Sequence, residues 1–133
     1  MIDAKVIRLL KEANFASLAT VSPVGSPQVS VVWVDVDSDH NILINTAIGR
    51  QKERNAQINS RVALSVINKS NPYETATISG KVIDRITKDA ITHFDRLSEK
   101  YLNLKYYPLA QARSKRIILK ISPTKVTYLL IPI

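Results

Sequence analysis

A short run of hydroxyl, glycine and basic residues is the part of the chain best suited to chemistry. A predicted strand ends at Thr46, Gly49 provides a tight turn, and a predicted helix begins with Arg50 and Lys52. Backbone N–H groups at the start of a helix lack partners inside the helix and favour an anion. The forked guanidinium of arginine and the ammonium of lysine strengthen such a site. The run predicts a phosphate-binding turn, and taken alone it also fits a solvated basic turn.

The whole chain carries an excess of positive charge. It has 19 Lys and Arg residues against 11 Asp and Glu residues, which gives a formal net charge of +8. This charge favours an anionic partner, which could be nucleic acid, an anionic lipid surface or a phosphorylated small molecule. We expect weak, salt-sensitive DNA binding without sequence preference, and therefore no specific nucleic-acid partner.

The residue types in the chain exclude several kinds of chemistry. The chain has no cysteine, which excludes disulfides, thiolate catalysis and cysteine-ligated zinc. His40 falls in a predicted turn and His93 on a predicted helix, so both are expected to be solvated or to act as simple caps, and no metal site is expected. No side chain stands out as a catalytic acid, base or nucleophile, and none is assigned. Redox chemistry would then belong to a bound cofactor.

No segment looks like a membrane anchor or an export signal. The longest apolar runs are far shorter than the roughly 20 residues needed to span a bilayer. The first residues lack a basic stretch followed by an apolar one. The sequence therefore predicts a cytoplasmic protein with no membrane partner.

The apolar pattern predicts a single domain, residues 1–133, in which strands outnumber helices. Asp3 is expected to cap a first helix, and Thr87 a later one over residues 87–102. A short polar helix is expected over residues 50–59. Strands are expected over 16–21, 28–36, 42–46, 62–68 and 75–86, followed by a terminal hairpin of 117–121 and 126–131.

These six or seven antiparallel strands predict a mostly β fold with a few flanking helices. A closed or nearly closed barrel over about residues 15–131 would remove exposed sheet edges. The strand over 28–36 is apolar on both faces, which predicts burial on two sides. Gly80, inside the longest strand, predicts a bulge or bend.

The segment 103–116 is basic and aromatic but has no clear period. Tyr106 and Tyr107 lie beside Lys105, and Arg113 and Arg116 follow. Such a segment could bind single-stranded nucleic acid, could cover a cofactor tail or the mouth of a substrate site, or could be a loose basic surface. The residues by themselves leave these three interpretations open.

An ordered set of short motifs resembles a known family. The set comprises FASLATV (15–21), PVGSP (23–27), VVWVD (31–35), NT (45–46), GRQK (49–52), NSRVALSV (59–66), NPY (71–73) and SGKV (79–82). In this order and spacing it resembles the pyridoxamine 5'-phosphate oxidase-like split β-barrels. The resemblance implies an FMN-binding type of split barrel. It also implies a homodimer that binds FMN or the deazaflavin coenzyme F420 in a cleft between its two subunits.

The resemblance also implies roles for particular residues. Thr46, Arg50 and Lys52 would hold the cofactor phosphate. The strand that carries Gln28, Val31 and Trp33 would contact the flavin-like ring, and Thr75 would contact the cofactor as well. Gln51 stands where many relatives have arginine, which removes one charge from the phosphate site.

Two departures from the vitamin B6 oxidases bear on function. Trp33 stands where those enzymes carry a basic residue, and their C-terminal substrate-binding segment with its Trp and Arg is not visible in this sequence. We therefore expect an FMN- or F420-dependent oxidoreductase acting on an unidentified small molecule, and not a true pyridoxamine phosphate oxidase. The choice between FMN and F420 stays open. The alternatives are a non-catalytic split barrel that sequesters flavin or haem, and a basic nucleic-acid-binding module.

Overall fold

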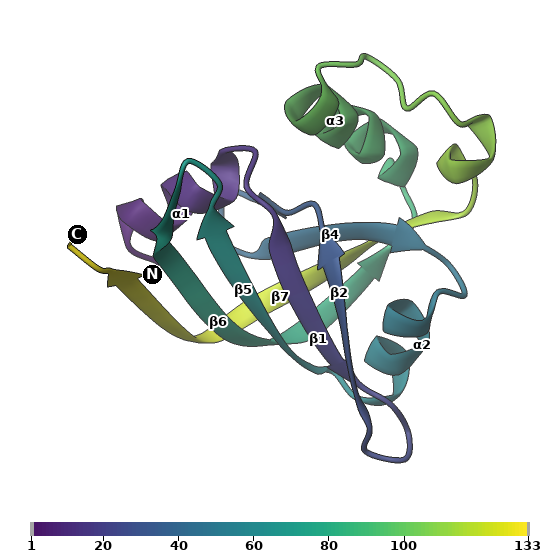
Figure 1. Cartoon of the computed structure of the whole chain (residues 1–133). Coiled ribbons are helices and arrows are strands. Elements are labelled where there is room, and N and C mark those ends of the chain that lie inside the picture. The colour runs from purple at the N-terminus through teal and green to yellow at the C-terminus, as the bar shows by residue number, and fades with distance from the viewer. Residues whose placement is uncertain (1, 133) are drawn as a thin grey trace.

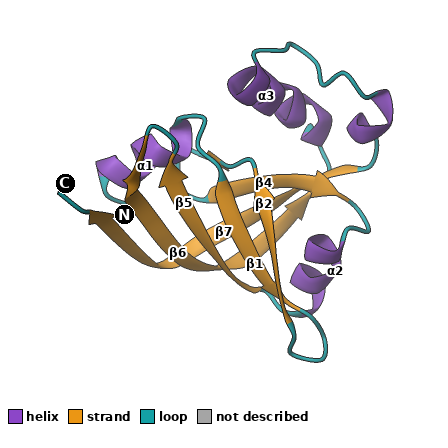
Figure 2. Ribbon diagram, viewed as in Figure 1, coloured by secondary structure: helices purple, strands orange, loops and turns teal. Residues whose placement is uncertain are grey.

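The computed structural model describes residues 2–132, and these form one antiparallel seven-stranded sheet with three α-helices (Figures 1 and 2). The strands follow one another across the sheet in the order β2-β1-β5-β6-β7-β4-β3. Their bounds are β1 Ala16–Val21, β2 Pro27–Val32, β3 Asp35–Val36, β4 Ile42–Ala47, β5 Arg61–Asn68, β6 Asn71–Ile86 and β7 Arg116–Leu130. The mostly β split-barrel prediction is confirmed.

The two edges of the sheet are consecutive in the chain. β2 and β3 lie at opposite edges, and only Trp33 and Val34 connect them. The chain therefore bends from one edge to the other at this point. The prediction of one strand over 28–36 is wrong, because the bend takes Trp33 and Val34 out of the ladder.

The predicted two-sided burial of this strand is also wrong within one chain. Val29 and Val31 are 63% and 68% exposed. β2 is an edge strand, and no other element within residues 2–132 covers the outward face of these two residues. An apolar outer face is thus left open to solvent.

The barrel interior is filled by aliphatic side chains that alternate with outward-facing ones along each strand. Fully buried examples are Leu18, Ile42, Ile44, Ile78 and Ile121. Helix α1 (Ala4–Lys11) adds Val6, Leu9 and Leu10 to this core. Asp3 caps α1 as predicted, because its side chain accepts a hydrogen bond from the Lys5 N–H at 2.8 Å. Among residues 2–132, no helix combines the length and the apolar character needed to cross a bilayer.

Helix α3 (Ala90–Leu102) stands beyond the ends of β4 and β7 (Figure 1). The predicted cap at Thr87 is wrong: the N-cap is Asp89, which has a left-handed backbone with φ of 59° and makes no side-chain cap bond. Thr87 contributes instead its carbonyl oxygen, which accepts from the Ala90 N–H at 3.2 Å.

The chain ends in one long strand and not in the predicted hairpin. β7 pairs with β6 almost throughout, from Glu74↔Leu130 to Ile86↔Ile118. The turn-like residues around Pro123 form a bulge in this ladder. Gly80 pairs with Pro123 and Ser79 with Lys125, so Thr124 is the extra residue. The bulge predicted at Gly80 is confirmed.

Replacing Gly80 by alanine should destabilise the barrel. A Cβ at this position would lie 2.6 Å from the Ser122 carbonyl oxygen and 2.8 Å from Ile121 Cγ2. Relieving these overlaps requires the two strands to shift, which we expect to cost about 1–3 kcal/mol of unfolding free energy. Denaturant unfolding measures this loss. Ser79→Ala, at the exposed neighbouring position, is the matched control and should change stability little.

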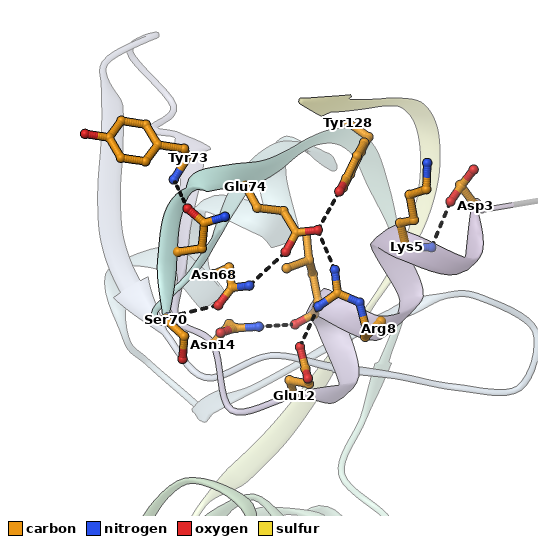
Figure 3. A network of polar contacts seen from close by, with 12 residues as sticks. Asp3, Lys5, Arg8, Glu12, Asn14, Asn68, Ser70, Tyr73, Glu74 and Tyr128 are labelled. Atoms are coloured by element: carbon orange, nitrogen blue, oxygen red, sulfur yellow. Dashed lines mark hydrogen bonds and ion pairs between the residues drawn. The ribbon is translucent and has the colours of Figure 1, made fainter. Parts of the chain in front are cut away.

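A buried carboxylate ties α1 to the sheet (Figure 3). Glu74 on β6 accepts hydrogen bonds from Arg8 of α1, from Tyr128 of β7 and, at 2.8 Å, from Asn68. The bonds from Tyr128 and Asn68 lower the pKa of Glu74, and Arg8 adds to this against the opposing effect of burial. The network stabilises the ionised form of Glu74.

Glu74→Gln should therefore lower stability by about 1–2 kcal/mol at neutral pH. The folded-state pKa of Glu74 lies below its unfolded value of about 4.3. Its contribution is therefore complete above that value and is lost as the pH falls through the lowered folded pKa. Denaturant midpoints of the wild type and the variant should converge in acid. Midpoints that stayed equally far apart at every pH would contradict a role for the ionised carboxylate.

Candidate functional site

A cleft of about 300 Å³ lies among four parts of the chain. β2 and the bend after it contribute Val31, Val32 and Trp33, and β4 contributes Asn45, Thr46 and Ala47. The remaining lining residues are Arg50, Lys52, Phe94, Tyr107, Ala112 and Arg116. The structure thus brings together five residues singled out from the sequence: Thr46, Arg50, Lys52, Val31 and Trp33.

The basic turn has the local structure expected from the sequence. β4 ends at Ala47 and helix α2 (Gln51–Ile58) begins after Gly49, whose φ of 94° favours glycine. The Arg50 N–H donates to the Ala47 carbonyl at 3.2 Å, which closes the turn. Arg50 is the N-cap residue and makes no side-chain cap bond. Its guanidinium is therefore available to the cleft together with the first N–H groups of α2.

Three positive side chains meet in this cleft. Burial lowers the pKa of Lys52, and the charges of Arg50 and Arg116 lower it further. Burial and Arg50 lower the pKa of Arg116 to about 10, with Tyr107 acting in the opposite direction. No Asp or Glu is among the described residues that line the cleft. A bound anion would relieve the repulsion among these cations.

Arg116 is the site residue that sequence reasoning missed. Its Nε donates to Asn45 Oδ1 at 2.8 Å and its NH1 to the Ala112 carbonyl at 3.0 Å. The guanidinium carbon lies 3.9 Å from the centroid of the Phe94 ring. In the sequence Arg116 is one of several basic residues in a segment without period. No local signal marks it, because β7 brings it to the cleft from far along the chain.

An aromatic cluster adjoins the cationic part of the cleft. The Trp33 ring stacks on Tyr101 with centroids 5.1 Å apart and planes 5° apart. Phe94 lies 6.0 Å from Trp33, and Tyr107 meets it edge-on at 6.1 Å. Trp33, Phe94 and Tyr107 all line the cleft. A ligand with a planar ring and an anionic group would find both surfaces here.

The segment 103–116 folds over this cleft. Tyr107, Ala112 and Arg116 line it, and the Arg113 guanidinium is anchored by two bonds to Asp95, at 3.0 and 2.6 Å. The segment therefore forms one wall of the cleft, which is the position that the second of the three interpretations requires.

Gln28 and Gln51 do not line the cleft. The Gln51 amide donates to Asn55 Oδ1 at 2.6 Å, and Asn55 Nδ2 donates to the Thr20 hydroxyl at 3.0 Å. That hydroxyl donates to Gln28 Oε1 at 3.1 Å. The structure therefore places both glutamines in a network that joins α2 to β1 and β2, beside the cleft.

His93 is buried, so the expectation of a solvated histidine is wrong. It is 1% exposed and lies between two polar partners. Its Nε2 is 2.9 Å from Asp35 Oδ2, and its Nδ1 is 3.0 Å from Asn45 Nδ2. The sequence of α3 gives no sign of these contacts, because Asp35 and Asn45 belong to strands that are distant in sequence.

Thr75 also lies outside the cleft of its own chain. It sits on the outer face of β6, opposite Ile67 on β5 and Leu129 on β7. Around Thr75 a stretch of this outer face carries no ionisable group, and it ends where Lys125 lies opposite Ser79. Its residues are Ser17, Ala19, Val29, Val31, Ala63, Ser65, Ile67, Thr75, Thr77, Thr127 and Leu129. We call this set the uncharged outer face.

The fold and the cleft together define a split β-barrel with a cationic cleft beside an aromatic cluster. Residues 2–130 match the family described as pyridoxamine 5'-phosphate oxidase, and the chain belongs to this family. No curated protein matches the chain in a sequence comparison.

Solved structures share this fold. One named "F420 Reductase" is 32% identical, with a TM-score of 0.80 over 90% of this chain and 94% of that one. A conserved hypothetical protein of Mycobacterium tuberculosis is 19% identical, with a TM-score of 0.78 over 97% and 84%. General Stress Protein 26 of Bacillus anthracis is 15% identical, with a TM-score of 0.66 over 94% and 91%. The last two likenesses concern the fold alone.

Proposed function

We propose that the cleft binds a phosphate-bearing flavin or deazaflavin, FMN or F420, and that the protein is an oxidoreductase acting on a small molecule. The observation that carries this proposal is the meeting of Arg50, Lys52 and Arg116 without a lining carboxylate, next to an aromatic cluster. Family membership and the 32% identical structure named "F420 Reductase" support it. When bound, such a cofactor accepts or donates a hydride.

The residues of the chain would bind and orient the cofactor. Arg50 and Lys52, with the first N–H groups of α2, provide the donors for a phosphate. Thr46 lies beside them and offers a hydroxyl. Trp33 and Val31 provide apolar surface for a ring, and the cations would stabilise negative charge on a reduced cofactor. No acid or base from the described residues of the cleft is assigned a proton-transfer step.

We also propose that the protein is a homodimer, in which the two copies contact each other through the uncharged outer face. Val31 belongs both to this face and to the cleft, so a second copy seated on the face would also border the cleft. Thr75 on the same face would then reach the partner's site. Apolar and small polar residues at this density favour burial against a like surface.

The arrangement of charge favours this function over nucleic-acid binding. Several cations outside the cleft are paired with carboxylates: Arg8 with Glu74, Arg85 with Glu53, Arg113 with Asp95 and Lys120 with Asp37. Of the side chains that ligate haem iron, the described cleft-lining residues include Tyr107 but no histidine, cysteine or methionine. A compact cationic cleft suits a small phosphorylated ligand better than a polymer.

Native mass spectrometry and a visible spectrum of freshly purified protein test the proposal together. We expect a dimer that carries, or takes up on titration, one FMN or F420 per chain, with the absorbance of a bound flavin or deazaflavin. Competition between the two cofactors decides which one the cleft prefers. If neither cofactor copurified or bound, and only nucleic acid was retained, the proposal would be wrong.

A further inference from the structure

A buried chain of polar side chains connects a partly exposed carboxylate to the cationic cleft. It starts at Asp35 on β3 and passes through His93 of α3, with 2.9 Å between Asp35 Oδ2 and His93 Nε2. It continues through Asn45 of β4, with 3.0 Å between His93 Nδ1 and Asn45 Nδ2. It ends at Arg116, whose Nε donates to Asn45 Oδ1 at 2.8 Å. His93 itself does not line the cleft.

The direction of each hydrogen bond in this chain follows from its partners. Asn45 Nδ2 lies 2.8 Å from the Ala90 carbonyl oxygen, which can only accept, so this atom is the amide nitrogen. The same nitrogen donates to His93 Nδ1, which must therefore be without a proton. The proton of the neutral ring then resides on Nε2 and is donated to Asp35. With the amide held this way, Asn45 Oδ1 faces Arg116.

We infer that His93 is a positioning residue for Arg116, and that a second proton on its ring releases Arg116 from Asn45. This inference rests on the proposed anion-binding function of the cleft. A proton on Nδ1 would point at the Asn45 amide hydrogens, and an Asn45 rotated to accept it would lose the Ala90 bond. The rotated amide would also turn its N–H groups toward the Arg116 guanidinium. Anion affinity should therefore fall when His93 becomes protonated.

The charged groups around His93 act in both directions. Asp35 carries the negative charge nearest to the ring. Burial acts to raise the pKa of Asp35, but the hydrogen bonds with His93 and Val36 and the charge of Lys100 outweigh burial, so the pKa of Asp35 is lowered. Lys100, on α3 near Asp35, opposes added positive charge. On the cleft side, the positive charges of Arg116, Arg50 and Lys52 also oppose a positive charge on His93, and Arg116 is the one bonded to Asn45.

Two substitutions distinguish the contribution of His93 Nδ1 from that of His93 Nε2. His93→Asn places its carbonyl oxygen near the position of Nδ1, which keeps an acceptor for Asn45 and loses the bond to Asp35. His93→Gln places its amide near the position of Nε2, which keeps the bond to Asp35 and loses the acceptor. A residue that merely filled space would give the two variants equal affinity.

The experiment titrates sulfate into the full-length protein by calorimetry, because sulfate stays a dianion from about pH 5 to pH 8, where histidines generally titrate. At about pH 8 we expect His93→Asn to bind within about twofold of wild type. His93→Gln should bind about three- to tenfold more weakly, the worth of one hydrogen bond. Wild type should lose affinity as the pH falls, whereas His93→Asn should lose much less. Equal affinities of the two variants, or identical pH profiles of His93→Asn and wild type, would overturn the inference.

A second measurement needs no His93 variant and no ligand. The Nε–H signal of Arg116 in a nitrogen-15 NMR spectrum, assigned by its disappearance in Arg116→Lys, should have its proton shift move upfield between about pH 8 and pH 5, because that proton leaves its hydrogen bond to Asn45 Oδ1. A signal that is unchanged between these conditions overturns the inference even if sulfate binds. If wild type bound neither sulfate nor cofactor while the NMR change occurred, the positioning role would stand and the proposed function would fail.

Discussion

Replacing Arg50 by alanine is expected to weaken binding of FMN or F420, whichever the wild type takes up, by about one to two orders of magnitude. Hydrogen bonds to charged groups are worth roughly 1.5–3 kcal/mol, and Arg50 offers a forked guanidinium in the turn that we propose binds the phosphate. Lys52→Ala should have a smaller effect, because an ammonium is a point charge without the fork. Fluorescence or calorimetric titration of the cofactor measures both losses.

The matched control for Arg50→Ala is Arg54→Ala. Arg54 lies on the same helix, is exposed, and bonds to Gln51 Oε1 at 2.6 Å, but it does not line the cleft. This variant removes the same charge and should leave affinity nearly unchanged. Thermal unfolding of the apo-proteins shows whether the variants are folded. Equal losses from Arg50→Ala and Arg54→Ala would mean that overall charge, and not the turn, attracts the cofactor.

Ser65→Glu is expected to split the proposed dimer and to remove cofactor binding with it. Ser65 lies in the row Val31–Ser17–Ser65–Thr77–Thr127, at the middle of the uncharged outer face. Two-fold symmetry would bury this charge once from each copy, and a desolvated charge without a partner costs several kcal/mol. Wild type should sediment as a dimer at micromolar concentration, and the variant as a 14.9 kDa monomer.

Ser70→Glu serves as the control for this change. Ser70 is exposed in the turn between β5 and β6 and lies outside the uncharged outer face. The same substitution there should leave both the dimer and the affinity intact. A wild type that is monomeric at micromolar concentration, or a monomeric Ser65→Glu that binds the cofactor as tightly as wild type, would contradict a site shared between two copies.

The local features of this protein could be predicted from the sequence. The turn from Thr46 to Lys52 could be recognised because glycine, the strand end and the helix start are adjacent in the chain. Asp3 as a cap was predictable for the same reason, since it depends on near neighbours in the chain. The bulge at Gly80 was predictable because a glycine inside a strand often marks one. The ordered motifs allowed the barrel fold to be predicted.

Errors arose where a neighbour from elsewhere in the chain decides the outcome. The residues around Pro123 look like a turn, but β6 pairs along the whole segment and makes it a bulge in β7. The strand over 28–36 looks doubly buried, but the barrel places β2 at an edge and bends the chain at Trp33.

The sequence by itself therefore determined the split barrel and the local structure of the basic turn from Thr46 to Lys52, and the tertiary structure alone decided what completes the cleft. Arg116 arrives on β7 through pairing with β4, and His93 reaches Asp35 and Asn45 only because α3 packs at the ends of those strands. The physical reason is that hydrogen bonds and charge repulsion depend on distances in space. Residues more than 40 positions apart in the chain leave no periodic or local trace of such contacts.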